Sequence, residues 1–562
     1  MTLTLQGDYA TGDNGVITTY QSPHPNHSLP AALALLAVLT ACNQSAAPEN
    51  QTGSGPPTET AIQAPVDQAP GTESACERLA GLVLDDTTIT LAERVGPGAF
   101  PAPPSPPMGP PQSGFDRLPA FCRVAATITP TSDSQIKIEV WMPEENWNGK
   151  FVGVGNGVWA GNLSYGFMVE PVARGYASAT TDTGHEMSAM DASFAAGHPE
   201  KFKDFGDRAI HEMTLKAKAL IAAYYGAKPQ RSLWTSCSTG GRQGLMEASR
   251  HPRDYDAIAA MAPANPMIRL MIGSLWSGDV SMKDAASRLT PVKLKAVHEA
   301  VLKSCDASDG VTDRIVSDPR QCSFDPAVLL CTGGDAPDCL TPPQADALRA
   351  IYAGPVNPRT GEEIYPGFSP GSEELLVALT SGPEPFAAAT TLFRSVVFKD
   401  PHWDYRAFDY DKDATRVIAE YGPVIDAGPD ISQFVQGGGK LLLSHGWADG
   451  LIPARSTISY YEAVKDELSA ETIKDSVALF MMPGVSHCGG GSGPFLFDTI
   501  GILETWLDDG TPPEMIIAHR PPDAEGKVMS RPLCPYPQRV QYKGESDTDQ
   551  ASSFTCTGRD TP

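Results

Sequence analysis

A chain of 562 residues with 67 acidic and 42 basic side chains carries a formal net charge of −25, and so has no excess of positive charge to set against phosphates. This balance excludes recognition of nucleic acid by a basic surface, and we expect no nucleic-acid partner. The length exceeds the size at which a single hydrophobic core stops growing, so we expect a main domain with a large insertion or a second domain.

The first 42 residues predict an export signal. Residues 29–42 are apolar and end in Leu39-Thr40-Ala41-Cys42, which resembles a bacterial lipobox with Cys42 as the lipidated residue. The apolar stretch is too short to span a membrane. No Lys or Arg precedes Arg78, although export signals begin with positive charge, which indicates that translation starts later than Met1. We expect an exported protein, periplasmic or extracellular, with an outer-membrane tether through Cys42.

Two further features fit export. The 11 Cys residues include no Cys-x-x-Cys pair, which favours a disulfide framework formed in an oxidising compartment over a metal site. Residues 43–74 are rich in Pro, Gln, Ser, Thr and Ala, with few large apolar side chains, and predict a disordered linker between the signal and the folded region.

Short apolar runs alternate with amphipathic segments from 122 to 263 and again from 437 to 510. This alternation predicts an α/β fold in which a mostly parallel sheet is covered on both faces. Residues 264–430 instead hold clusters of Pro, Asp and Cys, and we expect them to form an insertion over the edge of a main domain made of 75–263 and 431–562. The predicted strands are 135–143, 151–155, 176–182, 233–238, 257–263, 440–445 and 477–482.

Residues 233–242, Leu-Trp-Thr-Ser-Cys-Ser-Thr-Gly-Gly-Arg, predict a strand, a tight turn and a helix that lift the hydroxyl of Ser238 above the sheet edge. Such a nucleophile elbow usually reads Gly-x-Ser-x-Gly, and Ser236 replaces the first Gly here. By itself the motif also fits a Ser-rich turn without a catalytic role.

Two later strand ends carry the groups that an activated serine needs. Asp449 follows the strand at 440–445, and His487 lies in a Gly-rich loop after the strand at 477–482. Active sites of parallel α/β proteins lie at these ends, and the order Ser, Asp, His is that of α/β-hydrolases. We therefore predict that His487 takes the proton of Ser238 while Asp449 orients the imidazole. The other histidines that could act as the base, ranked below His487, are His185, His251 and His445.

The cysteines beside the predicted triad suggest a disulfide. Cys237 precedes Ser238 and Cys488 follows His487, so contact between serine and histidine would bring the two cysteines within bridging distance. With Cys42 set aside, the other eight pair naturally in chain order, although the sequence leaves other connectivities open. These further pairs are Cys76–Cys122, Cys305–Cys322, Cys331–Cys339 and Cys534–Cys556.

The motifs Cys237-Ser-Thr-Gly-Gly241, His445-Gly-Trp-Ala-Asp449 and His487-Cys488 together resemble the tannase and feruloyl esterase family. The segments 531–537 and 542–544 resemble the family's C-terminal signature, and the likeness spans about 75–560. It implies an α/β-hydrolase fold with a large inserted lid at 264–430 and a disulfide that links the triad. The family also contains hydrolases of mono(2-hydroxyethyl) terephthalate, so membership does not name the substrate.

For the oxyanion hole, the α/β-hydrolase pattern points to the backbone N–H of Thr239. A second donor belongs to the Gly-rich loop at 153–161, where the resemblance favours Gly157. The alternative is that these glycines only allow a tight turn.

The insertion also contains a candidate metal site at 305–315. Asp306, Asp309 and Asp313 surround a Gly turn, and carboxylates so close together repel one another unless a hard cation lies between them. The resemblance implies a structural calcium ion that is also held by the carbonyl groups of Val311 and Ile315. The alternative is a solvated acidic turn.

Substrate recognition is the least specified feature. Among the aromatic residues of the insertion, most of which we expect in its core, we select Trp403 and Phe408 as candidates to stack on an aromatic acyl group. Arg406 could pair with a substrate carboxylate. We expect a monomeric, secreted serine esterase that cleaves esters of aromatic acids, feruloyl or galloyl, through an acyl-enzyme on Ser238. The alternatives are a terephthalate monoester hydrolase, a general carboxylesterase, or a catalytically silent, lipid-anchored binding protein.

Overall fold

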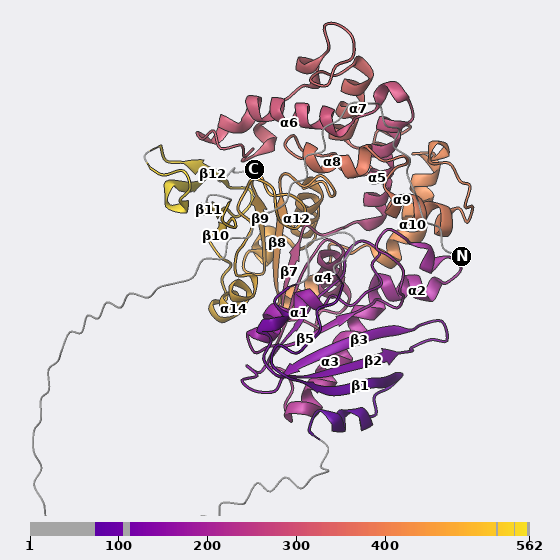
Figure 1. Cartoon of the computed structure of the whole chain (residues 1–562), viewed down its shortest axis with the longest axis vertical. Helices are drawn as coiled ribbons and strands as arrows, with labels where there is room; N and C mark the ends of the chain where they lie inside the picture. The colour runs from indigo at the N-terminus through magenta and orange to yellow at the C-terminus, as the bar shows by residue number, and fades with distance from the viewer. Residues whose placement is uncertain (1–73, 105–112, 524–525, 545, 559–562) are drawn as a thin grey trace, which may run out of the picture. The chain divides into compact units, whose positions relative to one another are not determined.

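The computed structural model describes residues 74–104, 113–523, 526–544 and 546–558 (Figure 1). The predicted export signal, the lipidation site Cys42 and nearly all of the predicted linker lie outside these residues. Within the described part of the chain, no helix is both long enough and apolar enough to cross a membrane.

A nine-stranded sheet, in the order β1-β2-β3-β5-β4-β6-β7-β8-β9, is the centre of the fold. The strands β1, β2, β3 and β5 pair antiparallel, and every pair from β5 through β4 to β9 is parallel. The predicted α/β class is therefore confirmed, with an antiparallel extension at one edge. The strands are β1 Thr87–Val95, β2 Phe121–Ile128, β3 Ile136–Pro143, β4 Lys150–Gly153, β5 Ala177–Thr181, β6 Arg231–Cys237, β7 Ala257–Met261, β8 Lys440–Gly446 and β9 Val477–Met482.

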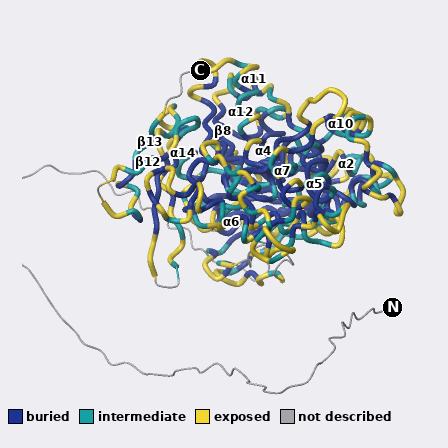
Figure 2. The backbone as a smooth tube through the Cα atoms, turned by 90° about the horizontal axis from the view of Figure 1, so that it is seen from above, coloured by how far each residue is buried: buried dark blue, intermediate teal, exposed yellow. Residues whose placement is uncertain are grey.

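Helices cover both faces of this sheet, which explains the continuous apolar runs of its central strands. In β8, Leu441 and Leu443 pack with the helices of one face, whereas Leu442 packs with those of the other. Helices α3, α4, α11 and α12 form the first layer, and α1 and α14 the second. Figure 2 shows that α4 is buried in the interior. Their bounds are α1 Tyr165–Ala173, α3 Ala209–Tyr225, α4 Thr239–Arg250, α11 Ser432–Gln436, α12 Arg455–Leu468 and α14 Thr499–Asp509.

The chain between β7 and β8 forms a helical region, the lid, which lies above the sheet in Figure 1. Its buried side chains form a core of their own and a second core shared with the segment 159–205. The indole N–H of Trp159 donates to the carbonyl of Ala388 at 3.0 Å, which ties the lid to the loop after β4. The lid helices are α5 Met267–Met282, α6 Pro291–Cys305, α7 Pro342–Ala353, α8 Glu373–Thr380, α9 Ala387–Thr391 and α10 Lys412–Ile425.

Two short helices, α2 Pro199–Lys203 and α13 Ala470–Ile473, complete the main domain. Its C-terminal part forms two small antiparallel sheets, β10 Ile516–His519 with β11 Ser530–Leu533 and β12 Arg539–Tyr542 with β13 Phe554–Thr557. All five predicted disulfides are present: Cys76–Cys122, Cys237–Cys488, Cys305–Cys322, Cys331–Cys339 and Cys534–Cys556.

Candidate active site

The predicted elbow is formed between β6 and α4. Ser238 connects them with φ 63° and ψ −126°, a backbone conformation that a non-glycine residue adopts only under constraint. A Cβ at Gly240 would lie 1.9 Å from the Ser236 hydroxyl, so the glycine lets the helix pass close to the strand. Ser236, which replaces the usual first glycine, has a role of its own: its hydroxyl accepts the N–H of Gly155 at 3.3 Å.

The three predicted triad residues meet at the C-terminal ends of β6, β8 and β9. The Ser238 hydroxyl lies 3.0 Å from Nε2 of His487, and Nδ1 of His487 lies 2.7 Å from Oδ2 of Asp449. The other oxygen of Asp449 accepts the backbone N–H groups of Leu451 and Ile452, both at 2.9 Å. This geometry allows Nε2 to receive the serine proton while the carboxylate holds the other side of the ring.

The charge of Asp449 is preserved despite full burial. Burial by itself would raise the pKa of this carboxyl, but the charge of His487 and the hydrogen bonds from His445 and His487 outweigh it and hold the pKa well below its usual range. Asp449 is therefore charged at neutral pH and accepts the hydrogen bond from Nδ1 of His487.

The three rival histidines have other partners. His445 is fully buried, and its Nε2 contacts Oδ2 of Asp449 at 3.1 Å. His251 pairs with Asp207 at 2.8 Å, and the ring of His185 stacks on Phe194. The structure therefore brings His487, and none of these three, to the serine hydroxyl through a hydrogen bond.

The disulfide Cys237–Cys488 joins the residue before the serine to the residue after the histidine, across 251 positions of sequence. Loops after β6 and β9 that are not neighbours in the sheet are thereby held together at the point where Ser238 and His487 meet.

The loop after β4 lies against the start of α4, and its glycines differ in their surroundings. A Cβ at Gly155 would come within 2.4 Å of the Gln243 side chain, so this glycine serves close packing. A Cβ at Gly157 would meet no atom within 4 Å, so close packing does not require a glycine there, and its role as an oxyanion donor stays a prediction. Val158 has φ 47°, which is rare for a β-branched residue, and its carbonyl accepts the Thr239 hydroxyl at 2.8 Å.

One buried cation of the elbow had no assigned role in the sequence analysis. Arg242 is 0 % exposed, and its guanidinium donates to the carbonyl groups of Phe205, Gly206 and Ile425. Burial lowers its pKa to about 10, which still leaves it charged at neutral pH. Because Ile425 ends the lid helix α10, Arg242 connects the nucleophile helix α4 to the lid. The feature of the sequence that could have indicated this role is an Arg in the first turns of a helix predicted to be buried.

In the acidic loop of the lid, the side chains of Asp306 and Asp309 are buried. Asp306 accepts the N–H groups of Asp313, Arg314 and Ile315, and Asp309 accepts the Ser317 hydroxyl at 2.6 Å.

Asp313 pairs with Arg531 of β11 at 2.6 Å. Burial raises the pKa of Asp313, Arg531 opposes this rise, and Asp309 and Asp306 add to it. The loop offers only oxygen donors, as a hard cation prefers, but the carboxylate oxygens of Asp306, Asp309 and Asp313 do not all lie within 4.8 Å of one another in this structure.

The proposed substrate contacts have lid partners in the structure. Trp403 and Phe408 are 9 % and 6 % exposed and pack on Phe393 at 5.7 and 5.1 Å between ring centroids. The Arg406 guanidinium pairs with Asp404 and lies over the ring of Tyr405. These contacts account for the three side chains without a substrate, so their contact with substrate stays a prediction.

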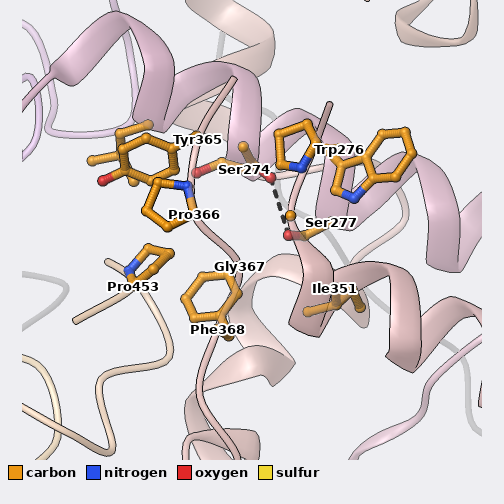
Figure 3. Close-up of a pocket in the computed structure, with 13 residues that line it drawn as sticks. Ser274, Trp276, Ser277, Ile351, Tyr365, Pro366, Gly367, Phe368 and Pro453 are labelled. Carbon is orange, nitrogen blue, oxygen red and sulfur yellow. Dashed lines mark hydrogen bonds between the residues drawn. The ribbon is translucent and has the colours of Figure 1, made fainter. Parts of the chain in front are cut away.

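The lid also contains a small pocket between α5, α7 and the segment 365–368 (Figure 3). Among the described residues, its lining includes Tyr365, Trp276 and Pro453 but none of the three substrate candidates. Pro453 belongs to the loop that follows Asp449, so the pocket lies at the contact between lid and catalytic loop.

Comparison with known proteins agrees with this arrangement. The sequence model of the family described as "Tannase and feruloyl esterase" matches residues 122–557. An uncharacterized esterase of Xanthomonas campestris pv. campestris is 38% identical over 533 residues, which are 86% of this chain and 91% of the relative. A probable feruloyl esterase B-2 of Aspergillus terreus is 29% identical over 456 residues, 77% of this chain and 86% of the relative.

The crystal structure of feruloyl esterase B from Aspergillus oryzae superposes with a TM-score of 0.78 at 27% identity, over 86% of this chain and 99% of that one. The α/β-hydrolase fold and the ester-hydrolase activity predicted from the sequence are thereby confirmed. The chain belongs to the tannase and feruloyl esterase family and is a carboxylic ester hydrolase of that type.

Proposed function

We propose that this enzyme cleaves esters of aromatic acids, of feruloyl or galloyl type, through an acyl-enzyme on Ser238. The observation that carries the mechanism is the continuous hydrogen-bonded chain from the Ser238 hydroxyl through His487 to Asp449, formed at three strand ends. The silent binding protein considered as an alternative has no use for this chain.

In the first step, the Ser238 oxygen attacks the ester carbonyl carbon while its proton passes to Nε2 of His487. The negative charge that develops on the carbonyl oxygen is stabilised by the N–H groups of Thr239 and Gly157. When the tetrahedral intermediate collapses, the ester C–O bond breaks and His487 gives its proton to the leaving alcohol. Water then attacks the acyl-enzyme by the same route and releases the acid.

The aromatic acyl group is supported by the feruloyl esterases among the relatives and by the density of aromatic side chains in the lid. Trp403, Phe408 and Arg406 are the side chains that we propose for contact with it. Because the first two are nearly buried, such contact requires the lid to open or shift.

We also propose that the lid loop holds a structural calcium ion through the carboxylates of Asp306, Asp309 and Asp313 and the carbonyl groups of Val311 and Ile315. When bound, the ion neutralises charge that Arg531 balances only in part. Among the described residues, the carboxylates of this loop have no hydrogen bond to Ser238, His487 or Asp449, and we assign the ion a role in stability alone.

Five disulfides support an exported protein, because such bonds form in oxidising compartments. Attachment to a membrane through lipidated Cys42 is a further proposal that rests on the sequence before residue 43.

The test is hydrolysis of methyl ferulate, methyl gallate and mono(2-hydroxyethyl) terephthalate, beside labelling of Ser238 by a fluorophosphonate probe. We expect turnover of one of the first two esters and loss of both turnover and labelling in Ser238→Ala. Turnover of the terephthalate ester alone would keep the mechanism and contradict the acyl group. A wild-type protein that is neither labelled nor active would contradict the mechanism.

A further inference from the structure

A second histidine shares the carboxylate of the triad. Nε2 of His445 lies 3.1 Å from Oδ2 of Asp449, the same oxygen that contacts His487 at 2.7 Å. Asp449 thus receives four hydrogen bonds, two from backbone N–H groups and two from imidazoles, and is only 1 % exposed.

The partners of His445 determine which of its nitrogens carries the proton. Nε2 faces two acceptors, Oδ2 of Asp449 and the carbonyl of Ile452, both at 3.1 Å, so it must be protonated. Nδ1 lies 2.7 Å from the Thr457 hydroxyl on α12, which can donate to it. The ring is 0 % exposed, so the strand β8 and helix α12 hold it in one orientation.

We propose that His445 is a positioning residue of the triad, a fixed donor to Asp449 that limits how strongly this carboxylate attracts the proton on His487. The proposal rests on the triad proposed above and deepens it. His445 contacts neither the serine nor the path of the proton; it acts through Asp449.

Two physical effects follow from the shared oxygen. A donor on one side of Oδ2 restricts rotation of the carboxylate, which keeps the bond to Nδ1 of His487 aligned. The donor also withdraws charge from Oδ2, so the carboxylate stabilises an imidazolium on His487 less than it would alone. Removal of this donor should therefore strengthen the attraction of the carboxylate for the proton on His487, and the acid limb of the rate profile reports that change.

Three titratable groups of the described residues face Asp449. His487 approaches from the loop after β9, His445 from β8 itself, and Tyr365 from the lid. Burial raises the pKa of Tyr365, and Asp449 raises it further, so this phenol stays neutral through the pH range of activity. A change in the acid limb of the rate profile on replacement of His445 therefore reports on the His445–Asp449–His487 chain.

The test compares His445→Leu, which removes the donor, with His445→Gln, whose side-chain amide can still donate to Asp449. We expect kcat of the Leu variant to fall about 10–100-fold, the range of a hydrogen bond to a charged group, with KM unchanged. The acid limb of its kcat/KM profile should move up by about 0.5–1 pH unit. The Gln variant should recover most of kcat and return the limb towards its original pH.

A matched control is His298→Leu, which breaks another buried histidine–carboxylate pair, with Glu373 at 2.9 Å, inside the lid. It should lower the midpoint of thermal unfolding, Tm, but leave the acid limb in place. If His445→Leu behaves like this control, or if Leu and Gln variants have the same acid limb, His445 is only a core residue and the proposal is wrong.

A measurement on the wild-type enzyme covers the case in which the Leu variant does not fold. In protein labelled with ¹⁵N-histidine, Nε2 of His445 should have the chemical shift of a protonated nitrogen at the pH of activity. A shift typical of a nitrogen without a proton would remove the donor and overturn the proposal. Failure of the probe to label wild-type Ser238 would overturn the triad, and this inference with it; labelling together with an unmoved limb would overturn this inference alone.

Discussion

The catalytic edge of the sheet and the lid position their side chains in different ways. At the edge, Ser238, Asp449 and His487 each follow a parallel strand, and their reactive atoms meet at 3.0 and 2.7 Å. In the lid, the aromatic rings contact one another and Arg406 pairs with Asp404. At the edge, the strands place the reactive groups next to one another. In the lid, the aromatic and charged side chains pack and pair with neighbours in the lid itself.

This difference predicts that changes at the edge alter the rate and changes in the lid alter stability. The largest effect belongs to Ser238→Ala, for which we expect a loss of about 10⁴–10⁶-fold in kcat with an unchanged Tm, since the residue supplies the attacking oxygen and little packing. Steady-state kinetics and thermal unfolding check both expectations. Ser236→Ala removes a hydroxyl two residues away, and a loss equal to that of Ser238→Ala would contradict the assignment of the nucleophile.

The disulfides offer a direct comparison of the two regions. Replacing Cys237 and Cys488 together by Ala opens a link across 251 residues beside the triad, while the pair Cys331 and Cys339 closes a link across only 8 in the lid. Chain-entropy arguments give about 5.5 kcal/mol for the first and about 2.5 kcal/mol for the second. We expect the first variant to lose most of its activity and the second to keep its kcat.

Both variants would be compared by Tm and by kcat on the same ester. Full activity of the double variant at the edge, at a temperature where it is folded, would show that the bridge does not position the triad. The distinction between an edge that determines the rate and a lid that determines stability would then be wrong for the disulfides.

We expect a smaller loss of rate when the hydrogen bond from the Thr239 hydroxyl to the Val158 carbonyl, beside the proposed oxyanion hole, is removed. Thr239→Val keeps the backbone N–H but removes the hydroxyl that donates to the Val158 carbonyl, so the strained loop loses one of its constraints. We expect kcat to fall about tenfold with KM nearly unchanged, because the donors are needed most in the transition state. Thr239→Ser retains the hydroxyl and should restore the rate; equal rates for the two variants would contradict this role.

The same difference explains how far the sequence could predict this molecule. Ser238, Asp449 and His487 were identifiable because a parallel sheet brings the ends of its strands to one edge whatever the details of packing. The position of His445 next to Asp449 was visible as a four-residue spacing, but only the folded β8 turn shows that Nε2 faces the carboxylate.

In the lid, no such topological rule applies. Trp403 and Phe408 were chosen by residue type, and the structure packs both in an aromatic cluster whose composition depends on irregular loops. Likewise the partnership of Asp313 with Arg531 joins residues that are 218 positions apart, in segments whose contact no periodicity predicts.

The proposed calcium ion gives a test of the lid that should change stability but not rate. Its removal by EDTA should lower Tm while kcat at 25 °C stays the same, because the ion would bind only the folded loop and lies outside the chain of proton transfer. At a free calcium concentration of about 100 times Kd, the linkage term is about 2.7 kcal/mol. Asp309→Asn should abolish the dependence of Tm on calcium, whereas Asp404→Asn, in the same lid but outside the loop, should preserve it. If neither EDTA nor Asp309→Asn changes Tm, the loop binds no calcium, and its carboxylates are satisfied by the N–H groups of the loop and by Arg531. If chelation lowers kcat, the lid and the catalytic edge are not separate in function.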